Sequence, residues 1–259
     1  MTAWLVRSAR PAARMRLFCF PYAGIGASAF RLWPAALPAE VEVVSVQLPG
    51  RETRLHEPPL SAMPAMVGQL LPELRGQLDL PYALFGHSMG ATLAWATARA
   101  LAAEGVSPPL HVILSGRRAP RMPDPDLPLR DLSDAQFIDE IDRRYGGIPA
   151  QVRASADLMA LLLPALRADI AALETYRQGE AAPLPLPLTV FGGQQDARAP
   201  AAQMQAWRGE TSAAFHVQLF PGGHFFLNTS RPAVLAAVAR ILHPLLQGEP
   251  AAVAGHCAP

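Results

Sequence analysis

The chain has 259 residues, a hydrophobic fraction of 51% and a formal net charge of +1. It is long enough to bury a core without disulfides, and its charge is too balanced to indicate a nucleic acid as partner. Its 22 lysine-plus-arginine side chains are all arginines, which excludes a Schiff-base lysine and a Walker-type phosphate-binding loop.

Short apolar runs rich in Val, Phe and Leu predict strands that are covered on both faces. These runs lie at residues 15–20, 41–48, 82–85, 112–114, 188–191 and 215–220. Apolar residues at helical spacing predict helices between them, at residues 66–78, 91–103 and 233–246. Strands that alternate with helices predict an α/β fold with a mostly parallel sheet, whose functional sites form at the carboxyl ends of the strands.

Residues 117–183 interrupt this alternation. After a loop rich in Pro and Arg, Ser133 and Gln136 form a capping box that predicts the start of a helix, with Leu132 and Phe137 as its hydrophobic staple. A Gly-Gly pair ends this helix at residues 146–147.

A second helical pattern in the insertion covers residues 158–176, where Pro164 predicts a kink or a boundary. We therefore predict a core formed by residues 1–116 and 184–247, a helical lid formed by residues 117–183, and a flexible tail at 248–259. The alternative for 117–183 is a pair of packed helices that does not move.

The sequence Gly-His-Ser-Met-Gly at residues 86–90 matches the nucleophile motif G-x-S-x-G. The motif alone is weak, but here it follows a short apolar strand and opens a helix, as a nucleophile elbow requires. The strained turn would project the hydroxyl of Ser88 above the sheet edge. We therefore predict that Ser88 is the nucleophile.

A serine nucleophile needs a base and a carboxylate that orients it. His224 lies in the turn PGGHFF after the last predicted strand, and Asp196 lies in the loop GGQQDARAP after the strand before it. The chain order Ser, Asp, His is that of α/β-hydrolases. His87 adjoins the nucleophile but cannot share its direction, so we predict a packing role for it.

Two backbone N–H groups are needed to stabilise the oxyanion. One is predicted to be that of Met89, the residue after the nucleophile. The second is predicted in the glycine-rich loop FPYAGIGAS after the first long strand, at Ala23, with Tyr22 as its neighbour.

With these residues placed, the chain resembles the type II thioesterases that accompany modular polyketide and nonribosomal peptide synthetases. The resemblance spans nearly the whole chain and rests on FPYAG, QLPGRETR, GHSMG, SGRRAP, RADIAALETY, GGQQD and PGGHFF, in chain order. GHSMG is shared with many esterases, whereas its combination with LPGR and R-A-D…E-x-Y is much more specific.

The resemblance implies an α/β-hydrolase fold and a thioester hydrolase with no cofactor of its own. Its substrates would be acyl groups on the phosphopantetheine arm of an acyl or peptidyl carrier protein, and its role the removal of aberrant or stalled acyl units. The resemblance also favours a monomer. The catalytic roles would fall on Ser88, Asp196 and His224, and the oxyanion donors on Ala23 and Met89.

One departure from the family pattern concerns the oxyanion loop. The family usually has consecutive glycines after the alanine, whereas Ile25 here separates Gly24 from Gly26. The family pattern therefore does not predict the shape of this loop. The departure does not affect the predicted triad. Arg51 of the LPGR segment is interpreted as part of a structural turn and not as a catalytic residue.

The two cysteines, the amino-terminal residues and the apolar runs indicate which metal sites and which cellular location to expect. Cys19 and Cys257 match neither a disulfide framework nor a zinc site. Residues 1–18 are interrupted by arginine, and no uncharged apolar run approaches the length of a membrane span. We expect a cytoplasmic protein without a metal or a membrane partner.

Arginines cluster at the start of the insertion, at positions 117, 118, 121 and 130. One hypothesis is that they face an acidic carrier protein, and the alternative is a solvated loop. The sequence also leaves other functions open: a carboxylesterase on oxygen esters, a chain-releasing acyltransferase or cyclase, and a non-enzymatic binding protein of the same fold.

Overall fold

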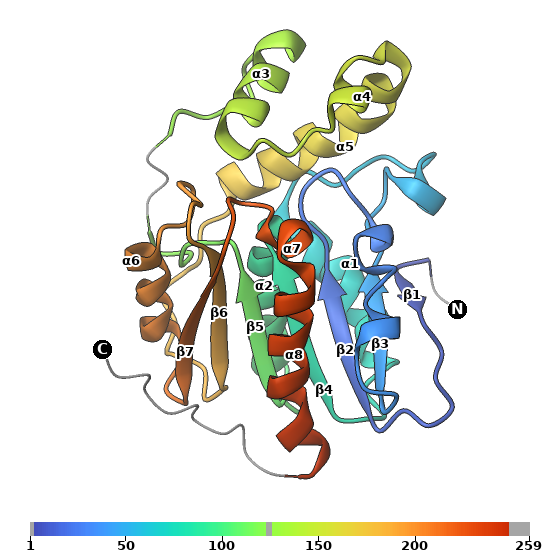
Figure 1. The fold of residues 1–259 in the computed structure, drawn as a ribbon, viewed down its shortest axis with the longest axis vertical. Coiled ribbons are helices and arrows are strands. Elements are labelled where there is room, and N and C mark those ends of the chain that lie inside the picture. The colour runs from blue at the N-terminus through green and yellow to red at the C-terminus, as the bar shows by residue number, and fades with distance from the viewer. Residues whose placement is uncertain (1–2, 123–125, 249–259) are drawn as a thin grey trace.

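A seven-stranded sheet forms the centre of the computed structural model, which describes residues 3–122 and 126–248 (Figure 1). The strand order is β1-β3-β2-β4-β5-β6-β7, and β1 is antiparallel to β3 whereas the other neighbouring pairs are parallel. The strands are β1 (Leu5–Arg7), β2 (Met15–Phe20), β3 (Val41–Val46), β4 (Tyr82–His87), β5 (His111–Ser115), β6 (Leu188–Gly193) and β7 (Phe215–Phe220).

Long helices cover both faces of the sheet, which is why the central strands are buried along their whole length (Figure 1). Helices α1 (Met63–Arg75) and α2 (Met89–Ala103) contribute to one apolar cluster with β2, β3 and β4. Helix α8 (Arg231–Leu246) packs into another cluster on the opposite face. The mostly parallel sheet between helical layers is the predicted α/β-hydrolase architecture.

Shorter helices lie in the connections of the core. They are η1 (Ala27–Phe30), η2 (Pro34–Ala36), η3 (Glu52–Arg54), α6 (Ala201–Met204), η4 (Gln205–Glu210) and α7 (Phe226–Thr229). Within residues 3–122 and 126–248, no helix has the length and apolar character to cross a bilayer.

The insertion forms a helical layer above the carboxyl ends of the strands (Figure 1). It contains α3 (Asp134–Tyr145), α4 (Ala150–Arg153) and α5 (Ala156–Thr175). The predicted capping box of Ser133 and Gln136 is present, and Gly146 ends α3 in the left-handed conformation. The predicted boundary at Pro164 is wrong, because α5 continues through this residue.

Other differences from the sequence-based prediction are local. Strand β1 was not predicted, because its three residues are too few to show a period. Helix α1 begins at Met63 and ends at Arg75, three residues earlier at each end than the predicted range of 66–78. The predicted flexible tail at 248–259 lies outside the described residues except for Gly248.

Candidate active site

The turn between β4 and α2 holds Ser88 in a strained conformation, with φ 54° and ψ −116°. Glycines make this turn possible. A Cβ on Gly86 would lie 2.1 Å from the carbonyl oxygen of Gly90, and a Cβ on Gly90 would lie 2.0 Å from that of Phe20. The glycines of the motif are therefore required by close backbone packing, which supports the interpretation as a nucleophile elbow.

The structure brings together the predicted nucleophile, base and carboxylate. Nε2 of His224 lies 2.9 Å from Oγ of Ser88, and its Nδ1 lies 2.8 Å from Oδ2 of Asp196. The other carboxylate oxygen of Asp196 accepts the backbone N–H of Arg198 at 2.9 Å. All three side chains are buried, so their hydrogen bonds are shielded from water.

His87 is buried beside the ring of His224. Its Nδ1 lies 2.9 Å from Oγ of Ser115, and its ring centroid is 5.3 Å from that of His224. Burial, followed by the nearby charge of His224, lowers the pKa of His87 well below its usual value. His87 is thus a neutral packing residue, in agreement with the sequence-based prediction.

The predicted oxyanion donors lie next to Ser88 in different elements. Met89 is the first residue of α2, where a backbone N–H has no intrahelical acceptor. Ala23 lies in the loop after β2 and lines the same cavity as Ser88. Across the part of the chain that the structure describes, no acceptor is found for the N–H of Ala23.

The amides that follow Ala23 in this loop are occupied. Each backbone N–H from residue 24 to residue 28 has an acceptor within the protein. The acceptors are, in order, Asp169, Tyr22, Glu52, Gln47 and again Glu52. Because these amides already have acceptors within the protein and that of Ala23 does not, the Ala23 N–H is available to a ligand. The loop has this arrangement although Ile25 departs from the family pattern.

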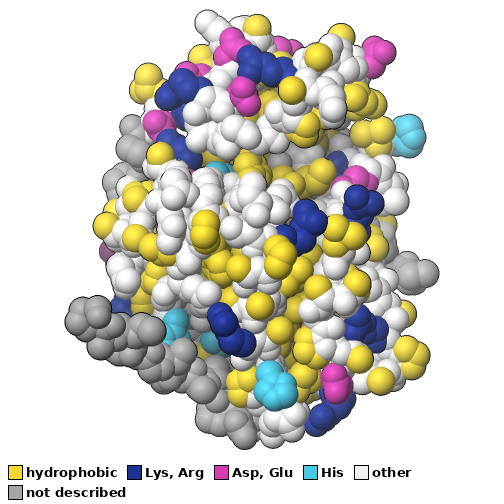
Figure 2. All heavy atoms as spheres, in the orientation of Figure 1, with side chains coloured by type: hydrophobic (Ala, Val, Ile, Leu, Met, Phe, Trp, Pro, Cys, Tyr) yellow, Lys and Arg dark blue, Asp and Glu magenta, His cyan; other side chains and the backbone are white. Residues whose placement is uncertain are grey.

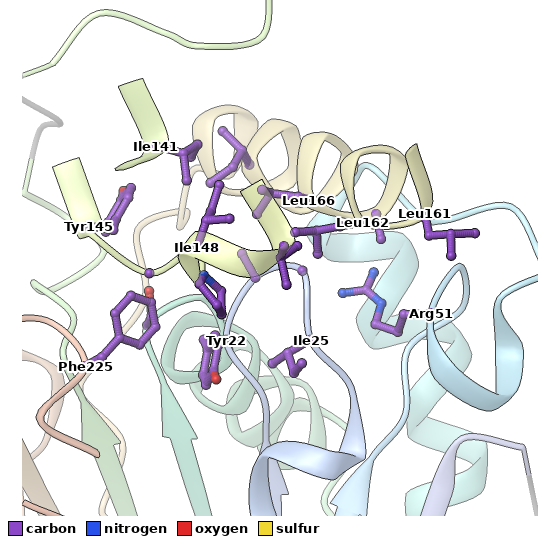
Figure 3. A pocket seen from close by; sticks show the side chains of 18 of the residues that line it. Tyr22, Ile25, Arg51, Ile141, Tyr145, Ile148, Leu161, Leu162, Leu166 and Phe225 are labelled. Carbon is purple, nitrogen blue, oxygen red and sulfur yellow. The ribbon is translucent and has the colours of Figure 1, made fainter. Parts of the chain in front are cut away.

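A cavity of about 510 Å³ opens above Ser88, between the core and the insertion (Figure 3). Its walls are largely apolar, with Ile141, Ile148, Leu162 and Leu166 contributed by the insertion. Figure 2 shows hydrophobic side chains gathered along the seam between the helical layer and the sheet. The cavity therefore suits an apolar chain whose reactive end reaches the serine.

The insertion also contacts His224 directly, which sequence reasoning missed. The ring of Tyr145, at the end of α3, lies 5.0 Å from that of His224. A Cβ on Gly147 would lie 2.1 Å from the ring of Phe225, the residue after the base. The Gly-Gly pair was interpreted as a helix stop, and its second glycine also lets the insertion approach the active site.

The arginine cluster at the start of the insertion does not form one exposed patch. Arg118 is only 4% exposed, and Arg121 donates to the buried carboxylate of Glu210 at 2.8 Å. The side chain of Arg130 is about half exposed, with Asp131 beside it. Arg118 therefore cannot take part in docking as an exposed residue, so the hypothesis does not hold for the whole cluster.

Residues 3–122 and 126–248 contain no group of three or more His, Cys, Asp or Glu side chains that could hold a metal ion. Cys19 is buried and unpaired, and its burial raises the pKa of its thiol well above the usual value. Its role is apolar packing within β2.

Comparison with protein-family models decides the family. Residues 15–246 match the model described as "Thioesterase domain". The chain belongs to this thioesterase family. The match spans strands β2 to β7, the insertion and the three side chains that meet at the elbow, so the enzyme is a thioester hydrolase of the α/β-hydrolase fold.

Relatives of the enzyme include one protein named for gramicidin S biosynthesis and one named as a thioesterase. It is 39% identical over 244 residues to the gramicidin S biosynthesis protein GrsT of Aneurinibacillus migulanus, covering 94% of this chain and 95% of that protein. It is 38% identical over 223 residues to the thioesterase PikA5 of Streptomyces venezuelae, covering 84% of this chain and 77% of that protein.

Solved structures give the same assignment. The thioesterase RedJ from the prodiginine pathway of Streptomyces coelicolor superposes with a TM-score of 0.83 at 40% identity, covering 89% of this chain and 87% of that one. The type II thioesterase BorB from the borrelidin cluster superposes with a TM-score of 0.83 at 36% identity, covering 92% and 97%. The resemblance to type II thioesterases is thus confirmed.

Proposed function

We propose that Ser88, His224 and Asp196 form the catalytic triad of this thioesterase and that its substrates are acyl groups on the phosphopantetheine arm of a carrier protein. The observation that carries the proposal is the continuous hydrogen-bond chain from Asp196 through His224 to Ser88 at the base of an apolar cavity. Such a chain is the arrangement that activates a serine hydroxyl.

Acylation begins when His224 takes the Ser88 proton and Oγ attacks the thioester carbonyl. The negative charge that develops on the carbonyl oxygen is stabilised by the backbone N–H groups of Met89 and Ala23. His224 then gives the proton to the departing sulfur, and the pantetheine thiol leaves. Asp196 holds the ring with its proton on Nδ1 and stabilises the imidazolium without taking up the proton itself.

Deacylation repeats these steps with water. His224 takes a proton from the water as its oxygen attacks the acyl-serine, and returns the proton to Oγ of Ser88 as the acid is released. A thiol is a good leaving group, so we expect deacylation to limit the rate. The donors at Met89 and Ala23 serve both steps.

The biological role follows from the relatives and from the cavity. Proteins similar to this chain are named for gramicidin S biosynthesis and for the borrelidin cluster. A hydrolase with an apolar cavity at its serine is suited to release stalled or aberrant acyl units from a polyketide or nonribosomal peptide synthase. We expect it to act as a monomer in the cytoplasm, without a cofactor, on acyl or peptidyl carrier domains.

The insertion at 117–183 is proposed to act as the lid of this site. It supplies most of the apolar wall of the cavity, together with the Tyr145 ring beside His224. A carrier-bound acyl chain would enter between the insertion and the core, where Leu158 and Leu161 of α5 line the cavity and are half exposed.

The proposed function is tested by presenting one acyl group in three forms: on a carrier protein, on a short pantetheine-like thiol and as an oxygen ester. The Ser88→Ala variant is the blank. We expect both thioesters to be hydrolysed and the carrier-bound form to have the highest kcat/KM. An oxygen ester hydrolysed tenfold faster than either thioester would refute the assignment of substrate while leaving the triad intact.

A further inference from the structure

Two distinctive segments of the sequence, LPGR and R-A-D, have no part in the triad chemistry, yet their charged side chains meet. Arg51 follows β3 and Asp169 lies in α5 of the insertion, 118 positions further along the chain. The guanidinium contacts both carboxylate oxygens, with Nη2 2.9 Å from Oδ1 and Nη1 bonded to Oδ2. Arg51 is 4% exposed and Asp169 is fully buried, so this is a bidentate ion pair inside the protein.

The same carboxylate also holds the oxyanion loop. The backbone N–H of Gly24 donates to Oδ2 of Asp169 at 2.8 Å, and Gly24 directly follows the proposed oxyanion donor Ala23. Gly24 has a φ of +79°, and a Cβ there would lie 3.1 Å from Leu162 and 3.2 Å from Leu166. Helix α5 therefore rests directly on this loop, and Figure 3 shows these leucines and Arg51 at the cavity beside it.

A second set of contacts holds the loop from the side of β3. Glu52, adjacent to Arg51, accepts the N–H of Gly26 at 2.9 Å, and Gln47 accepts that of Ala27 at 2.8 Å. The loop is thus held between the segment after β3 and helix α5, with Arg51 joined to both. The hydrogen bond to Asp169 fixes the peptide unit that follows Ala23, and so constrains the direction of the Ala23 N–H.

We propose that Asp169 and Arg51 are positioning residues that hold the Ala23 amide in the orientation needed to stabilise the oxyanion. The insertion is then part of the catalytic apparatus as well as the wall of the cavity. The inference rests on the proposed function because it takes Ala23 as an oxyanion donor. It adds a contribution from α5 that the triad does not require.

The ion pair explains why an arginine is needed behind the loop. Burial raises the pKa of the Asp169 carboxyl, while the charge and hydrogen bonds of Arg51 act in the opposite direction. Without Arg51 the buried carboxyl would take up a proton more readily and become a weaker acceptor for the Gly24 N–H. Arg51 therefore acts on the loop through Asp169.

A matched pair of double variants separates this positioning from simple stability. Arg51→Met with Asp169→Asn removes both charges but keeps an acceptor for Gly24, whereas Arg51→Met with Asp169→Leu removes the acceptor as well. Small displacements of catalytic groups cost up to about 100-fold in rate. We therefore expect kcat of the leucine variant to be about 10- to 100-fold below that of the asparagine variant, with KM nearly unchanged.

Inhibition by an alkyl trifluoromethyl ketone measures stabilisation of the oxyanion. Ser88 adds to the ketone carbonyl and forms a tetrahedral adduct whose oxygen carries the negative charge. The affinity for this ketone should fall in the leucine variant by the same factor as kcat/KM. The matched control is Arg16→Met with Glu42→Leu, which removes a buried ion pair of 2.8 Å between the amino-terminal parts of β2 and β3. It should lower the Tm but leave kcat and inhibitor affinity unchanged.

Equal kcat and equal inhibitor affinity in the two double variants would overturn the proposal, as would an equal loss of kcat in the control. If the leucine double variant does not fold, the single variants Asp169→Asn and Asp169→Leu replace the pair, with the same expected order. Rates on an activated p-nitrophenyl ester are measured in parallel. They test the positioning role even if the wild-type enzyme fails to hydrolyse carrier-bound thioesters, an outcome that would refute only the proposed substrate.

Discussion

The orientation of the His224 ring is the residue-scale feature on which the proposed mechanism depends. With a proton on Nδ1 facing Asp196 at 2.8 Å, Nε2 presents its lone pair to the Ser88 hydroxyl at 2.9 Å. Replacing Asp196 by Asn leaves the shape unchanged but favours the wrong tautomer of the base. We expect Asp196→Asn to lower kcat by about 10⁴, measured on an acyl-pantetheine thioester. A rate near that of the wild type would show that another group orients His224.

Ser88 itself allows a sharper test because its removal changes little else. Ser88 is 7% exposed, and its Oγ lies within hydrogen-bond distance of His224 Nε2, at 2.9 Å. We expect Ser88→Ala to lower kcat by about 10⁴ to 10⁶ with an unchanged Tm, and to abolish labelling by a fluorophosphonate. Residual labelling at another serine would contradict the assignment of the nucleophile.

The sequence alone predicted that three residues following predicted strands would lie close together, and the structure brings them together. Ser88, Asp196 and His224 each lie just after an apolar run, and a parallel sheet gathers such positions at one edge. The pairing of Arg51 with Asp169 could not be predicted in this way, since 118 positions separate them and neither lies in a periodic pattern that indicates a contact. Arg51 was accordingly interpreted only as part of a turn.

At the scale of elements, helix α3 combines a small buried face with a capped amino-terminal end. Its buried side chains are Phe137 and Ile141, and its capping box joins Ser133 to Gln136. We expect Ser133→Ala to destabilise α3 by about 1 kcal/mol. Hydrogen exchange should show faster exchange in α3 and no change in α2. The matched control is Ser155→Ala, which removes the corresponding cap of α5.

The same variant tests how far the insertion acts on the base. Tyr145 lies at the end of α3 with its ring 5.0 Å from that of His224. If this contact helps to hold the base, fraying of α3 in Ser133→Ala should lower kcat several-fold. Unchanged kcat together with faster exchange in α3 would show that Tyr145 does not position His224.

Elements differed in how well the sequence predicted them, for physical reasons. The strands from β2 to β6 are buried along their length, so each carries a short run of mostly apolar residues that the sequence shows. Strand β1 has three residues and lies at the sheet edge, which leaves no pattern. Pro164 was expected to kink or end its helix, and the second alternative is wrong, since α5 continues beyond it through the buried residues Ala165, Leu166 and Ile170.

On the scale of the whole molecule, many charged side chains of the described residues lie in ion pairs with a side chain of opposite charge. Figure 2 shows basic and acidic side chains interspersed on the outer surface of the insertion. The pairs there include Arg143 with Glu140 at 2.7 Å and Arg167 with Asp134 at 2.7 Å. Docking of an acidic carrier by a uniformly basic surface is therefore not supported, and recognition would depend more on the apolar rim of the cavity.

Two buried histidines make the stability of the whole fold depend on pH. Burial, followed by the nearby charge of His216, lowers the pKa of His111, in β5, from 6.5 to about 4. Its Nε2 lies 2.9 Å from Oγ1 of Thr189 on the neighbouring strand. Burial lowers the pKa of His87 in the same direction. Both side chains are therefore neutral in the folded protein at pH values where the unfolded chain binds a proton on each.

The sign of the effect follows from this difference in bound protons. Because the unfolded state binds more protons between pH 4 and 6.5, stability is fully present above this window and is lost as the pH falls through it. His111 alone should contribute a slope of about 1.4 kcal/mol per pH unit to the free energy of unfolding. Urea unfolding of the wild type and of His111→Gln, from pH 5 to 7, should show a smaller slope in the variant below pH 6.5, whatever its stability at pH 7. Parallel curves would mean that His111 is not buried in its neutral form.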